Sequence, residues 1–231
     1  MWLTVALAGL VLGGKHALDA DHLAAVATMA SESSNRWRAA AVGALWGLGH
    51  TLALALAGVA VLHVGVTIPA WLTWWLELLV AVSLVGLGAS ALWALWRGRT
   101  VHIHVHRHGS RWHAHLHLHK QPHGVEEVDH SHHGVLSARP FAFGVLHGLA
   151  GSGALFLLVL ATQPNAWVAW CYLAAFGLGS TLGMTAFSLL FSAPLRFAAL
   201  EARRWHTRMR AFAASASLVV GLVLGFSLVT S

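Results

Sequence analysis

The sequence has a single cysteine, Cys171, among its 231 residues. One thiol cannot form a disulfide within the chain, and it cannot form a two-thiol redox relay. Charged residues make up only 10% of the chain, whereas a soluble domain carries roughly 25%. The glycine-rich Lys-Ser/Thr loop that cradles nucleotide phosphates is also missing, so we expect no ATP hydrolysis by this chain. These absences argue against a soluble enzyme, and we predict that the protein is not an enzyme.

Hydrophobic residues make up 57% of the chain, and most of them fall in long blocks. A block of about 20 apolar residues is long enough to cross a bilayer as a helix. The sequence therefore predicts an all-α integral membrane protein with six transmembrane helices, at about 2–30, 39–63, 71–96, 140–162, 167–193 and 212–230.

The basic residues predict which side of the membrane each link faces. Of the fourteen Lys and Arg residues, all except Lys15 fall in or beside the first, third and fifth links between the spans. Cytoplasmic links are enriched in Lys and Arg. We therefore expect an inner-membrane protein with both termini outside and residues 97–139 in the cytoplasm. The net charge of +6 then reflects membrane topology, not nucleic-acid binding.

Two short segments occur twice at nearly the same spacing. His16 recurs as His147, and Gly47-Leu48-Gly49-x-Thr51 recurs, with a spacing that differs by a single position, as Gly177-Leu178-Gly179-x-Thr181. A repeat of three spans places the second copy upside down, as in many transporters whose site lies at mid-membrane. We therefore predict a 3+3 inverted repeat, with residues 1–96 and 140–231 as the halves and 97–139 as the link.

The first span carries an unusual set of polar residues. An ionised carboxylate at mid-bilayer costs roughly 2.5–3.5 kcal/mol on insertion scales, so this set needs a compensating partner. Imidazole and carboxylate together suit borderline divalent transition metals. With one histidine from the second span and one from the second half, the predicted metal ligands are His16, Asp19, Asp21, His22, His50 and His147. The alternative is an ion pair between Lys15 and Asp19 with histidines that only pack.

Helix geometry divides these candidates. On an ideal helix, His16, Asp19 and His22 fall within about 120° of arc and share one face. Asp21 points away from that face. It would reach the same centre only if the helix unwinds, for example around Gly13-Gly14; the alternative is that it serves another neighbour.

These residues also form motifs that resemble a known family. His16-Ala-Leu-Asp-Ala-Asp21-His22 resembles the signature of the nickel/cobalt transporter family, and Leu48-Gly49-His50-Thr51 is similar to its second motif. His147-Gly-Leu-Ala-Gly-Ser152 matches the smaller, six-span urease-accessory nickel permeases. The Asp-Thr-Ala-Thr-Glu motif of larger members is not found. The resemblance implies metal binding by His16, Asp21, His22 and His50, and partners among cytosolic nickel chaperones or urease maturation factors.

The link between the halves is rich in histidine. Residues 102–133 hold twelve of the eighteen histidines, and eight of these alternate with other residues. Alternation places imidazoles on one face of an extended chain. We expect a mobile cytoplasmic loop that buffers metal; the alternative is a solvated linker. The eight predicted auxiliary ligands are His102, His104, His106, His108, His113, His115, His117 and His119.

Together these patterns favour a secondary transporter that takes up Ni²⁺ or Co²⁺ through a His/Asp site at mid-membrane. The partners are the metal ion and the lipid bilayer, with no cofactor beyond the transported ion. Efflux of the same metals is an alternative direction. A membrane haem protein, with iron held by histidine pairs, is an alternative from another class. The sequence does not decide between nickel and cobalt, and it does not give the oligomeric state.

Overall fold

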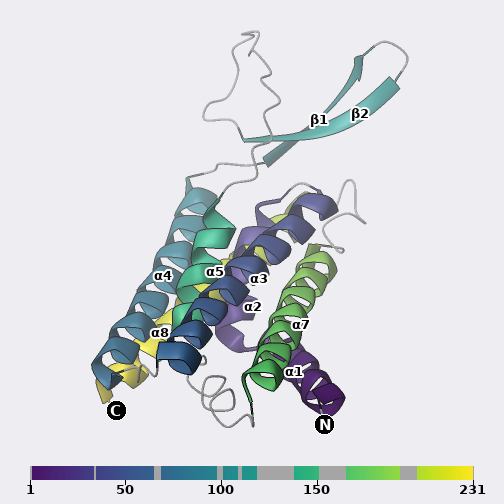
Figure 1. Cartoon of the computed structure of the whole chain (residues 1–231). Helices are drawn as coiled ribbons and strands as arrows, with labels where there is room; N and C mark the ends of the chain where they lie inside the picture. The colour runs from purple at the N-terminus through teal and green to yellow at the C-terminus, as the bar shows by residue number, and fades with distance from the viewer. Residues whose placement is uncertain are drawn as a thin grey trace.

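The structure, a computed structural model, shows a bundle of helices with a two-stranded hairpin beyond one end (Figure 1). Both chain termini lie at the other end of the bundle. The structure describes residues 2–33, 35–64, 69–97, 101–108, 111–118, 138–150, 165–192 and 202–230.

The helices follow the predicted apolar blocks. The first half contains α1 (Trp2–His16), α2 (Ala20–Ser31), α3 (Arg36–Val59), a π-helical turn (Ala60–Val64) and α4 (Ala70–Trp96). The second half contains α5 (Arg139–Leu149), α7 (Ala166–Ser192) and α8 (Ala202–Thr230).

Four of these helices are long and apolar enough to cross a membrane: α3, α4, α7 and the Trp205–Thr230 part of α8. The bent pair α1–α2 brings the number to as many as five. The chain is therefore an α-helical membrane protein. Of the span predicted at 140–162, the structure describes the part in α5, and residues 151–162 lie outside the described residues.

The first predicted span, 2–30, is wrong as a single helix. α1 and α2 are bent by 63° relative to each other, and between them Asp19 has extended backbone angles (φ −63°, ψ 146°) as the N-cap of α2. Carboxylates at the start of a helix are stabilised by its unpaired N–H groups and its dipole. Asp19 and Asp21 therefore favour a new helix start at this point. The helix does break, but between His16 and Ala20 and not at Gly13-Gly14, since both glycines lie within α1.

The two halves of the bundle pack on each other reciprocally. α1 packs on α7 and α5 packs on α3, while α3 contacts α7 and α4 contacts α8. A Cβ atom on Gly13 would overlap the backbone carbonyl of Phe176, and one on Gly144 would overlap that of Trp46. In the repeat, Gly144 is the equivalent of Gly13, as His147 is of His16. Phe176 is likewise the equivalent of Trp46, as Gly177 is of Gly47. The same close helix contact thus occurs twice, with the halves exchanged.

The histidine-rich link contains an antiparallel hairpin of β1 (Val101–His108) and β2 (Arg111–Leu118). The backbone is extended over both alternating runs, as alternation predicts, but we expected a loop and not paired strands. The missed signal is the period-two pattern of apolar residues between the histidines of 101–105, which favours a strand. The register pairs His102 with His117, His104 with His115 and His106 with His113. His119 lies outside the described residues.

Candidate metal centre

Four histidines from four helices meet inside the bundle. His16 ends α1, His22 lies in the first turn of α2, His50 lies within α3, and His147 lies in the last turn of α5. The His22 ring centroid lies 4.5 Å from that of His16, 5.2 Å from that of His50 and 5.4 Å from that of His147. His22, His50 and His147 are at most 2% exposed. The structure thus places all four predicted histidines around one point.

Three of these imidazoles are close enough to share an ion. The ligand atoms of His16, His22 and His50 all lie within 4.8 Å of one another. The Nε2 atoms of His16 and His50 are 3.1 Å apart. Two imidazole nitrogens bound to one metal at about 2.1 Å and at a right angle would be about 3.0 Å apart. The pair therefore already has the spacing of neighbouring metal ligands.

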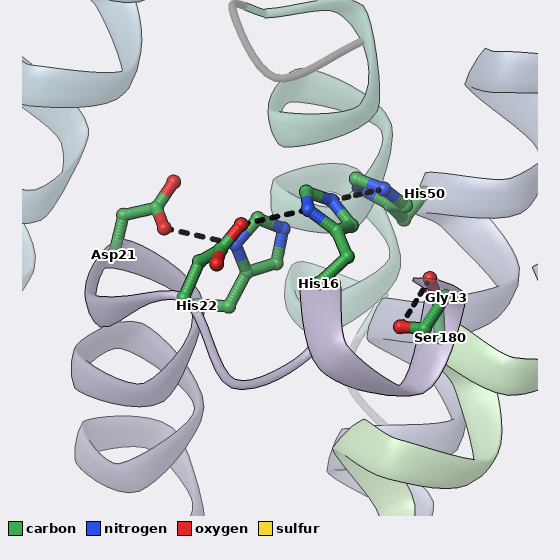
Figure 2. Close-up of polar contacts among 7 residues, drawn as sticks. Gly13, His16, Asp21, His22, His50 and Ser180 are labelled. Atoms are coloured by element: carbon green, nitrogen blue, oxygen red, sulfur yellow. Dashed lines mark hydrogen bonds and ion pairs between the residues drawn. The ribbon is translucent and has the colours of Figure 1, made fainter. Parts of the chain in front are cut away.

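The two predicted carboxylates contact the histidines instead of Lys15. Asp19 Oδ2 lies 2.8 Å from His16 Nδ1. Asp21 Oδ1 lies 2.9 Å from His22 Nδ1 (Figure 2). Among the ion pairs of the described residues, neither aspartate pairs with a lysine or an arginine. The aspartate side chains are 48% and 25% exposed, so they are more exposed than the imidazoles that they contact. On a single straight helix Asp21 would point away from the other predicted ligands. The break between α1 and α2 brings it to the site.

His147 is the contribution of the second half. Its Nδ1–H donates to the Phe143 carbonyl oxygen at 3.2 Å. Its Nε2 atom is buried and has no hydrogen-bond partner within the described part of the chain. His147 is not one of the three histidines whose ligand atoms already lie together. Its ring centroid lies 5.4 Å from that of His22, so it is a candidate fourth imidazole ligand.

Helix ends shape the electrostatics of the site. The carbonyl end of α1 reaches the site at His16, and the N–H end of α2 begins beside it. Carbonyl ends favour cations and N–H ends favour carboxylates, which is the arrangement seen in the broken helices of transporters. Ser180 of α7 donates to the Gly13 carbonyl oxygen at 3.1 Å and ties the end of α1 to α7 (Figure 2).

The sequence analysis missed two residues beside the histidines, Ser180 and Trp46. Ser180 is the equivalent of His50 in the repeat, because each directly precedes one of the equivalent threonines, Thr181 and Thr51. The repeat could therefore have identified it. Trp46 lies one helical turn before His50 and therefore shares its helix face. The Trp46 side chain is fully buried, with its ring centroid 4.8 Å from that of His147. It forms an apolar wall that keeps this side of the site away from water.

Comparison with known proteins supports the assignment from the motifs. The urease accessory protein UreH of Bacillus sp. (strain TB-90) is 34% identical to this chain over 201 residues, which cover 87% of this chain and 82% of the relative. No family profile and no solved structure matches this chain. The relative is named as an accessory protein. The chain therefore belongs to the family of the urease accessory protein UreH, and its motifs resemble those of the nickel/cobalt transporters.

Proposed function

We propose that the protein is a secondary transporter that takes up Ni²⁺ or Co²⁺ through the site formed by His16, His22 and His50. The observation that carries this proposal is the convergence of three buried imidazoles from three helices within 4.8 Å of one another. Imidazole nitrogen suits nickel, cobalt, copper and zinc, whereas magnesium, calcium and manganese prefer oxygen. A single cysteine leaves no thiolate set for copper(I).

The membrane potential supplies enough energy for uptake. A divalent cation that enters a negative-inside cell gains about 4.6 kcal/mol per 100 mV, twice the value for a single charge. This free energy corresponds to accumulation of about a thousandfold. Uptake therefore needs no coupling ion, while efflux of the same ion would need one.

The repeat supports a way to move the ion. In a 3+3 inverted repeat the two halves rock around a central site and open it to each side in turn. α3 and α7 cross where Thr51 Oγ1 lies 3.3 Å from Thr181 Oγ1, and these two residues are equivalent in the repeat. A contact between equivalent residues lies on the axis that relates the halves. We place the pivot of the rocking motion there.

Uptake as the direction of transport suggests a role for the histidine-rich link and a set of partners. The cross-strand histidine pairs of β1 and β2 support a cytosolic store that takes metal from the inner gate. The relative is named as a urease accessory protein, which supports delivery of imported nickel to urease maturation factors. This scheme requires both termini outside the cell and the hairpin inside.

The haem alternative is disfavoured by the site itself. The Nε2 atoms of His16 and His50 are in direct hydrogen-bonding contact, which leaves no room for a porphyrin between them. Uptake of radiolabelled ⁶³Ni²⁺ by cells with and without the protein tests the function and its direction. We expect uptake that His50→Ala removes and that His63→Ala leaves intact, since His63 is an exposed histidine outside the site. Lower cellular nickel with the protein than without it would establish efflux instead.

A further inference from the structure

Three of the four imidazoles at the site are held by the same ring nitrogen. Nδ1 of His16 lies 2.8 Å from Asp19, Nδ1 of His22 lies 2.9 Å from Asp21, and Nδ1 of His147 lies 3.2 Å from the Phe143 carbonyl oxygen. Carboxylate and carbonyl oxygens only accept hydrogen bonds, so each Nδ1 carries the hydrogen.

This arrangement fixes where the free lone pairs are. A neutral imidazole with hydrogen on Nδ1 has its lone pair on Nε2. Nε2 of His22 and Nε2 of His147 are buried and have no hydrogen-bond partner within the described residues. Nε2 of His16 accepts a hydrogen bond from Nε2 of His50, 3.1 Å away, and Nδ1 of His50 is then the buried nitrogen of that ring without a partner among the described residues. Buried acceptors without partners are costly, and a cation between the rings would satisfy those of His22 and His147 and replace the hydrogen bond at His16.

The carboxylates are arranged as partners of the imidazoles. Each uses an oxygen to hold a ring N–H, and each is more exposed than its histidine. Asp19, Asp21 and His22 also offer ligand atoms within 4.8 Å of one another, so a carboxylate-bound ion is the competing arrangement. An aspartate that holds Nδ1 of a ring lies across that ring from an ion at Nε2, so it could not bind this ion without moving. Ring nitrogens of metal-bound histidines are commonly held by carboxylates in this way.

We propose that the transported ion is bound by imidazole nitrogen alone, and that Asp19 and Asp21 are positioning residues that never bind it. The ligands are Nε2 of His16, His22 and His147 and one ring nitrogen of His50. His147 joins the three histidines that already lie together, and this links the second half of the protein to the ion. The proposal rests on the proposed function and specifies the ligands of that same site.

The test is X-ray absorption spectroscopy of Co²⁺ bound to the purified full chain in detergent, with affinities from titration calorimetry. The twelve histidines of 102–133 are replaced by glutamine in every sample, so that metal on the link does not contribute. We compare the unchanged site with Asp21→Asn, Asp21→Ala and the control Glu77→Gln. Glu77 lies in α4 and forms no part of the histidine cluster.

The proposal predicts a first shell of nitrogen, with imidazole scattering, that is the same in the parent and in Asp21→Asn. Asparagine retains an oxygen that accepts the Nδ1 hydrogen, so the affinity should fall less than tenfold. Alanine removes the acceptor, and the affinity should fall by about 10–100-fold, as for other partners of metal-bound histidines. Glu77→Gln should bind as the parent does.

Two results overturn the proposal, and they are distinguishable. A first-shell oxygen that is lost in both Asp21 variants, with equal loss of affinity, makes Asp21 a ligand while leaving the proposed function intact. Absence of Co²⁺ binding in the folded parent overturns the proposed function as well. Size-exclusion elution of each variant establishes that it is folded.

Discussion

Gly13→Ala is a one-carbon change that tests whether the contact between α1 and α7 positions the site. The new Cβ would overlap the backbone carbonyl of Phe176, and its next nearest atoms are also Phe176 backbone atoms. No side-chain rotation relieves such a clash, so α1 must move away from α7. His16 lies within one turn of Gly13 on the same helix and moves with it.

The size of the effect follows from the geometry. Overpacking of a well-packed contact costs about 1–3 kcal/mol. For a chain of this length, each kcal/mol lowers the melting temperature by about 2–4 °C. A displacement of about 1 Å at a reacting group can lower a rate by about a hundredfold, and we expect a similar loss of nickel transport.

Gly86→Ala is the matched control, since Gly86 is also helical and a Cβ on it would meet nothing within 4 Å. Alanine is favoured over glycine in a helix by about 0.5–1 kcal/mol, so this variant should be as stable as the parent or more stable. The assays are melting in detergent and ⁶³Ni²⁺ uptake. If Gly13→Ala melts and transports like Gly86→Ala, the close contact does not position the site, and the reasoning is refuted.

Three further changes have defined outcomes. Ser180→Ala removes the hydrogen bond to Gly13 and should cost about 0.5–1.5 kcal/mol of stability by thermal melting; no loss would mean that this bond does not secure the end of α1. Deletion of residues 102–133 should leave a folded carrier that still transports nickel but binds less metal in total, measured by uptake and equilibrium dialysis; loss of all transport would make the link an obligatory step. Single cysteines at Gly65 and Ser110, in a Cys171→Ser background, should react with an impermeant thiol reagent in intact cells only at Gly65; external labelling at Ser110 would reverse the topology.

The sequence predicted the helical membrane fold because its apolar blocks have the length that a bilayer requires. It raised an unwound first helix as one option but did not predict where the break between α1 and α2 lies, since the site considered was Gly13-Gly14. Those glycines lie in the part of α1 that packs on α7, and at Gly13 a side chain would not fit. The break depends on Asp19 and Asp21, which are costly inside a helix and favourable at its start. Acidic residues within an apolar span therefore indicate a helix start as well as a functional site.

The candidate histidines could also be named from the sequence, but their roles could not. Spacing on an ideal helix placed His16, Asp19 and His22 on one face, and it excluded Asp21 unless the chain unwound. Which nitrogen of each ring is free depends on hydrogen bonds to oxygen atoms, including the Phe143 carbonyl. The backbone geometry that positions such an acceptor is not visible in a residue pattern.

Flux of Ni²⁺ into proteoliposomes tests the central claim most directly. The purified full chain is reconstituted, and a potassium gradient with valinomycin sets a negative potential inside. The account predicts metal entry that grows with the potential, is absent in folded His22→Ala, and persists in His63→Ala. Entry that is equal in His22→Ala and the parent, or no entry at any potential, would contradict it.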